Sequence, residues 1–164
     1  MNDDSYKCLF ITNKSIQMQT FLPYPDFKSS AAVLDMRRLG KQRVETLQIL
    51  SALLGASKAW SNHPACKMWR GYEQGLVDYG ISITNEWISR GYKDTCLDKI
   101  AKFSNGRDII FPPWFGNEEF HRSHQSNLIR KLPEHYQIYF PDVPNDLPYI
   151  WPIDFKQEEK NFGH

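Results

Sequence analysis

A single carboxylate, Glu45, stands among cations and amides in the segment from residue 33 to residue 54. At about 100° per residue, one side of a helix here gathers polar side chains within roughly 140°. These side chains are Arg37, Arg38, Lys41, Gln42, Glu45 and Gln48. An ordinary solvated face mixes several acids with several bases, and this one does not. The pattern indicates an active-site carboxylate in an anion-binding setting, and the alternative is an amphipathic helix with a basic outer face.

Cations crowd the start of this helix. Its first three turns carry Arg37, Arg38, Lys41 and Arg43 against the two acids Asp35 and Glu45. Cations near a helix N-terminus oppose the macrodipole, so we expect an external anion such as a phosphate to compensate. Arg43 differs because it projects toward the apolar side, and a buried structural cation is the alternative for it.

The charge along the chain is uneven. Residues 27–133 hold 16 Lys and Arg against 10 Asp and Glu, whereas residues 134–164 hold 2 against 6. A basic body with an acidic tail suits a polyanionic partner. At 164 residues with 41% hydrophobic composition, the chain predicts one globular domain.

The cysteines and histidines are read as structural. The three cysteines are widely spaced and odd in number, which argues against a disulfide framework and favours the cytoplasm. His63-x-x-Cys66 and His121-x-x-His124 have ligand-like spacing. They lack a second ligand pair or an acid cluster, so we expect core residues or helix caps, with no metal and no cofactor. No apolar run predicts a membrane span.

Hydrophobic spacing predicts a mainly α protein, a compact single-domain helical bundle with irregular, proline- and aromatic-rich connections and a C-terminal wrap. Residues 1–17 are expected to be an appendage, 18–153 the domain and 154–164 a loose acidic tail. The first long helix is expected to be capped by Asp26, Ser29 or Ser30 and to end at Gly55. Its expected apolar side comprises Val33, Met36, Leu39, Gly40, Val44, Leu47, Leu50, Leu53 and Leu54.

Further helices are expected along the rest of the domain. One begins at Pro64 and carries an aromatic stripe, more typical of a core than of base stacking, down to Gly91. A short helix is expected over residues 95–103, a basic helix over 118–132 and a tyrosine-rich helix over 134–140. Gly71 and Gly75 are one turn apart and would let another helix approach closely.

The order of several motifs resembles one known family, whereas common catalytic signatures such as a Walker loop are absent. A threonine segment at Thr20 precedes the Leu34, Leu39, Glu45 spacing, and Asn62-His63-Pro64 follows. A later helix ends in Arg90-Gly91-Tyr92, and a basic helix leads into Lys131-Leu132-Pro133-Glu134-His135-Tyr136. Over roughly residues 20–140 the chain resembles the phage endonuclease V type of pyrimidine-dimer DNA glycosylase and AP lyase, with its bacterial relatives.

The resemblance implies a substrate, a reaction and the residues that carry it. In that family an N-terminal threonine amine attacks the sugar C1′ of a damaged nucleotide, and a helical glutamate handles protons. Carried over, Glu45 takes the glutamate's place and Arg38 that of a DNA-contacting cation, with duplex DNA as partner and no obligate protein partner. We expect nucleic-acid contacts from Arg37, Arg38, Gln42, Arg43, His63, Arg90, His121, Arg122, His124, Arg130 and Lys131.

The nucleophile departs from the family pattern. Thr20 follows Met18 and Gln19, so without processing it has no free amine. The amine of Lys41, one turn from Glu45, is a substitute, although its position favours a plain phosphate contact. Water activated by Glu45 is the alternative. Three hypotheses stay open: a glycosylase for a damaged or modified base, a catalytically silent nucleic-acid-binding module, and an enzyme acting on a free nucleotide or RNA.

Overall fold

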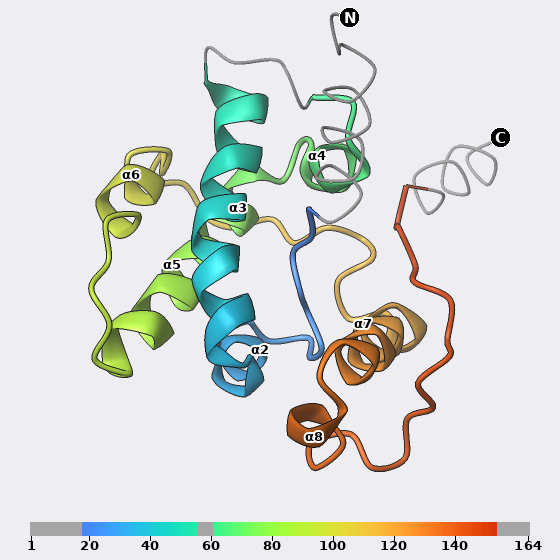
Figure 1. Cartoon of the computed structure of the whole chain (residues 1–164). Coiled ribbons are helices and arrows are strands. Elements are labelled where there is room, and N and C mark those ends of the chain that lie inside the picture. Colours follow the sequence, from blue (N-terminus) through green and yellow to red (C-terminus); the bar gives the residue numbers. More distant parts are fainter. Residues whose placement is uncertain (1–17, 56–60, 154–164) are drawn as a thin grey trace, which may run out of the picture.

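The computed structural model describes residues 18–55 and 61–153, so the expectations for 1–17 and 154–164 concern residues outside this range. The predicted all-helical fold is confirmed: the described part forms seven helices and no strand (Figure 1). They are α2 (Phe27–Val33), α3 (Met36–Leu54), α4 (Pro64–Trp69), α5 (Glu73–Ser89), α6 (Leu97–Ala101), α7 (Glu118–Lys131) and α8 (Pro133–Tyr136). None of these helices has the length and apolar character that crossing a bilayer requires.

The first long helix is interrupted, which corrects the expectation of one continuous helix from a cap at Asp26, Ser29 or Ser30 to Gly55. Leu34 has extended backbone angles and ends α2, and Asp35 begins α3 as its N-cap. The Asp35 carboxylate accepts a hydrogen bond from the Arg38 amide at 3.4 Å. Asp26 caps only the short α2, through a 2.8 Å bond from the Ser29 amide. The apolar periodicity therefore did not reveal that Asp35 caps a new helix.

The buried face of α3 also differs from the expected one. Met36 is 52% exposed and Val44 is 45% exposed, although both belong to the predicted apolar side. Gln42 and Glu45, predicted on the polar arc, are buried together with Thr46. The helix is turned so that part of its polar arc faces the interior of the protein, where the site lies.

The second expected helix is also two helices. Arg70 ends α4 with extended angles, and Gly71 has φ of +88°, a left-handed conformation that favours glycine. The aromatic stripe belongs to the core as predicted, because Trp69, Tyr79 and Ile83 are fully buried. The other expected helices are shorter at one or both ends than predicted, as the bounds of α6, α7 and α8 show.

Helix α3 packs most extensively against α5, which crosses behind it (Figure 1). The close approach occurs at Gly80, where an added Cβ would lie 2.7 Å from the Thr46 methyl and 3.1 Å from Ile100. The expectation placed the close approach at Gly71 and Gly75. An added Cβ at Gly75 would have an ordinary contact at 3.4 Å, and one at Gly71 would meet nothing within 4 Å.

Candidate active site

The chain from residue 18 to residue 25 runs as an extended segment between α3 and α7 (Figure 1). Side chains from both helices bond its backbone. On the α3 side, the Gln19 amide donates to Glu45 at 3.2 Å and the Phe21 amide donates to Gln42 at 3.0 Å. On the α7 side, the Gln125 side chain donates to the Pro23 carbonyl at 2.7 Å. This segment explains why polar residues of α3 are buried, since they satisfy its backbone groups.

Two histidines one turn apart on α7 hold a single residue of this segment. His121 Nδ1 donates to the Leu22 carbonyl at 2.8 Å, and His124 Nδ1 accepts from the Leu22 amide at 3.0 Å. Burial lowers the pKa of both, that of His124 to about 3, with a further contribution from His121. The His-x-x-His spacing thus serves backbone recognition, and the described residues contain no group of three or more His, Cys, Asp and Glu that could hold a metal ion.

Glu45 is 8% exposed and lies under this segment. Its Oε2 accepts from the Gln19 amide and, at 3.0 Å, from the Gln42 side chain, while its Oε1 lies 3.8 Å from Lys41 Nζ. Burial raises the pKa of the carboxyl, and these hydrogen bonds, with Lys41 and Lys131, oppose the rise. A carboxyl group with a raised pKa is suited to giving and taking protons near neutral pH.

Gln42 orients Glu45. Its Oε1 accepts from the Phe21 amide at 3.0 Å and from the Tyr79 hydroxyl at 2.7 Å, so its amide nitrogen must face Glu45. Tyr79 is fully buried, and burial raises its pKa, so its hydroxyl remains a donor. The carboxyl of Glu45 is therefore held on one side by a fixed network and is left with its other oxygen toward Lys41.

Glu45 lies at a cavity of about 240 Å³ between α3 and the end of α7. The cavity is lined by Phe21, Arg37, Arg38, Lys41, Gln42, Glu45 and Lys131. Arg38 is also paired with Asp35 at 3.2 Å. Burial lowers the pKa of Lys131, and the neighbouring Arg38 and Lys41 lower it further. This cavity contains one carboxyl group and four cations, and it opens to solvent. Such a cavity suits a ligand that carries phosphates around a reacting centre.

The structure gives other roles to several residues that we expected to contact nucleic acid. Arg43 pairs with Asp94 at 2.5 Å and covers the Trp87 ring at 4.3 Å, as the structural alternative for it predicted. Arg90 bonds Glu86 and donates to the Leu34 carbonyl at 2.8 Å beyond the end of α2.

Two further arginines, on the exposed side of α7, hold the C-terminal wrap. Arg122 donates to the Asp142 carbonyl at 3.3 Å, and Arg130 donates to the Asn145 carbonyl at 2.8 Å. His63 caps α4 through the Ala65 amide at 2.9 Å. These residues do not line the cavity, and neither do His121 and His124.

The position of Thr20 differs from the position that the resemblance implies. Its hydroxyl accepts from Trp69 Nε1 at 3.0 Å, and the residue is fully buried. The backbone nitrogen that reaches Glu45 is that of Gln19, one residue earlier. Gln19 and Phe21, whose backbone amides bond Glu45 and Gln42, are positions next to the candidate site that sequence reasoning missed. Their adjacency to Thr20 was the available signal.

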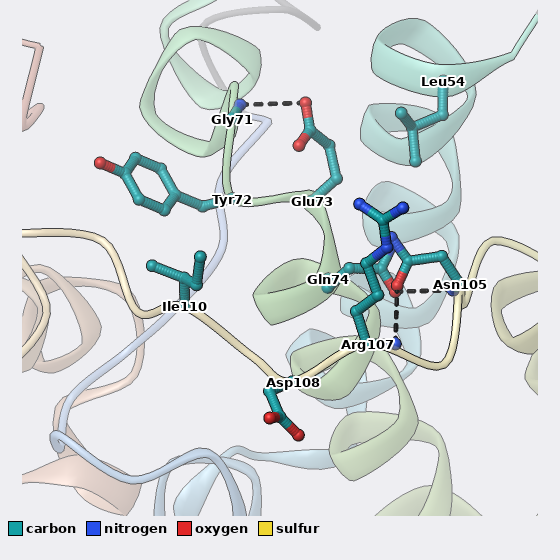
Figure 2. Close-up of a pocket in the computed structure, with 9 residues that line it drawn as sticks. All are labelled: Leu54, Gly71, Tyr72, Glu73, Gln74, Asn105, Arg107, Asp108 and Ile110. Carbon is teal, nitrogen blue, oxygen red and sulfur yellow. Dashed lines mark hydrogen bonds between the residues drawn. The ribbon is translucent and has the colours of Figure 1, made fainter.

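A second cavity, of about 250 Å³, lies at the opposite end of α3, near Leu54 (Figure 2). Its polar groups are largely engaged with the neighbouring backbone. Glu73 accepts from the Gly71 amide at 3.0 Å, and Gln74 accepts from the Asn105 amide at 2.9 Å. Its lining mixes two acids with Arg107, so it lacks the cationic character of the cavity at Glu45.

Comparison with known proteins places the core of this site within one family. The model of the pyrimidine dimer DNA glycosylase family matches residues 18–100, which include Glu45 and the extended segment. Searches of curated proteins and of solved structures found no match.

Proposed function

The chain belongs to the pyrimidine dimer DNA glycosylase family, and on that premise we propose that it removes a damaged pyrimidine from duplex DNA. Glu45 is the catalytic carboxylate in this proposal. Arg37, Arg38, Lys41 and Lys131 bind the phosphates that flank the damaged nucleotide. The family match supports the class of reaction, and the cavity supports the assignment of these residues.

One observation carries the proposal: a buried carboxyl group with a raised pKa lies at a cavity lined by four cations. Breaking a glycosidic bond builds positive charge on the sugar, which a carboxylate stabilises, and the departing base needs a proton. The surrounding cations bind the phosphates on either side of the damaged nucleotide. A carboxyl group used only for folding would not need an opening to solvent.

A catalytically silent DNA-binding module is the second candidate. The four cations alone would serve such a module, so DNA affinity does not separate the two functions. Release of a base does separate them. The four cations come from two helices, and this spread suits several phosphates of a strand. A free nucleotide is therefore a less suitable substrate.

The test is incubation of the full chain with duplexes that each carry one lesion, a cyclobutane pyrimidine dimer first among them. We expect cleavage of a glycosidic bond in at least one lesion duplex and none in the undamaged control. Tight binding to every duplex without any base release would contradict the glycosylase and support the silent module.

A further inference from the structure

Lys131 is the last residue of α7, and it lines the same cavity as Glu45 of α3. Its position is fixed at the backbone, because the Leu132 amide closes α7 on the Leu128 carbonyl at 3.0 Å and Pro133 begins α8. The charged groups around it are Arg38 and Lys41 of α3, Arg130 of its own helix, and Glu45 as the opposing acid. Lys131 therefore shares one cavity with the carboxyl group of Glu45.

Lys41, the lysine that the sequence favoured as a substitute nucleophile, has a different environment. Its side chain is 58% exposed, and its ammonium group lies 3.8 Å from Glu45 Oε1 as an ion pair. The ammonium group of Lys41 is thereby engaged by the carboxyl group of Glu45. Lys131 is exposed as well, but none of the ion pairs among the described residues involves it. Partial burial and the neighbouring Arg38 and Lys41 lower the pKa of its amine, which favours the nucleophilic form.

The backbone nitrogen of Gln19 is the other nitrogen near Glu45, at 3.2 Å. In this chain it is bonded to Met18 and is a peptide nitrogen without a nucleophilic lone pair. Among the described residues, the side-chain amines that line the cavity are those of Lys41 and Lys131.

We propose that Lys131 supplies the amine that attacks C1′ of the damaged nucleotide, with Glu45 as the proton donor. This inference rests on the proposed function and specifies its covalent step. It makes the protein a glycosylase that forms an imine, and hence one that can also break the strand by β-elimination.

The atoms balance in three steps. The lone pair of neutral Lys131 Nζ bonds to C1′, and the C1′–N bond to the base breaks with its electron pair on the base. One proton of the former amine then passes to the base. Finally the C1′–O4′ bond opens as O4′ takes the proton of Glu45, which leaves a protonated imine on Lys131 and a carboxylate at Glu45.

The experiment is reduction with borohydride during incubation with a duplex that carries an abasic site. Hydride addition to the imine carbon joins the protein to DNA through a stable secondary amine. We expect a trapped product with the full chain, a loss of at least about tenfold in Lys131→Gln, and a modified peptide that contains residue 131. Lys99→Gln, which removes an exposed lysine of α6, should trap like the unaltered chain.

Lys41→Gln separates chemistry from phosphate binding. Because Lys41 binds phosphates in this account and pairs with Glu45, its loss should lower DNA affinity and the yield of trapped product together, and the product that remains should still map to residue 131. A product that maps to Lys41 or to another amine would overturn the proposal. So would release of a damaged base without any trapped product, which would leave the proposed function intact and assign the attack to water. Absence of base release from every lesion duplex would instead contradict the proposed function itself.

Discussion

At the scale of single residues, two neutral histidines hold the segment that covers Glu45. His121 and His124 bind the carbonyl and the amide of Leu22, which requires opposite tautomers of the two rings. Protonation of His124 Nδ1 would remove the acceptor for the Leu22 amide. The position of the segment over Glu45 therefore depends on both rings being uncharged.

The stability of the protein should accordingly fall in mild acid. The pKa of His124 is lowered to about 3, so its contribution to stability is complete above the pKa of the unfolded chain, near 6.5, and is lost as pH falls below that value. Between pH 7 and pH 5 this loss is about 2 kcal/mol in the free energy of unfolding. Urea unfolding at the two pH values measures it.

His124→Asn is the matched variant, because the asparagine oxygen can replace Nδ1 as acceptor and does not titrate. Its free energy of unfolding should fall about 2 kcal/mol less between pH 7 and pH 5 than that of the unaltered chain. The raised pKa of Glu45 makes the free energy of unfolding larger as pH falls, which is opposite to the effect of His124. This contribution is the same in both proteins and therefore cancels in the comparison. An identical pH dependence in the two proteins would show that His124 is not held neutral.

Part of the candidate site could be predicted from the sequence. The spacing of Arg38, Lys41 and Glu45 on one arc identified the carboxylate and two cations of the cavity. The burial of Glu45 could not be predicted from the sequence. It depends on hydrogen bonds from the backbone amides of Gln19 and Phe21, and side-chain periodicity contains no information on them. The structural roles of arginines such as Arg90 were missed for the same reason, since their partners are carbonyl groups distant in sequence.

At the scale of elements, the contact between α3 and α5 sets the orientation of the helix that carries Glu45. Gly80→Ala should destabilise the protein by about 1–3 kcal/mol, because the new methyl would overlap the buried Thr46 side chain. Gly75→Ala in the same helix is the control, since its nearest contact would be an ordinary 3.4 Å. We expect that change to be neutral or stabilising, because alanine favours helix. Thermal or urea unfolding compares the two.

Equal effects of the two alanine substitutions would contradict the close packing at Gly80.

The elements also show where prediction from sequence stops. Helix type and approximate bounds followed from apolar spacing, whereas the break at Leu34 and Asp35 did not. An aspartate within a helical pattern does not reveal whether it caps a new helix, because the Tyr136 hydroxyl that bonds its backbone amide lies 101 residues away.

At the scale of the whole molecule, two groups of cations have different roles. Arg37, Lys41 and Lys131 line the cavity, while Arg122 and Arg130 bind the C-terminal wrap. The net charge of +1 hides this division. We therefore expect DNA phosphates to contact the cavity rim and not the outer side of α7.

The salt dependence of DNA affinity tests this division. Replacing Arg37 and Lys41 together by glutamine should lower the slope of log affinity against log salt by about two units. The control pair is Lys102 and Arg107, which removes the same charge away from the cavity and should leave the slope within about half a unit. An equal loss in both double variants would show that the protein binds DNA by its overall charge alone.

The central claim, catalysis by Glu45, is tested most directly by base release from a pyrimidine-dimer duplex under single-turnover conditions. Glu45→Gln keeps an oxygen for the Gln19 amide and the Gln42 side chain but cannot titrate. We predict that base release falls at least about 100-fold, with DNA affinity and unfolding little changed. Base release at a rate near that of the unaltered chain would contradict the account.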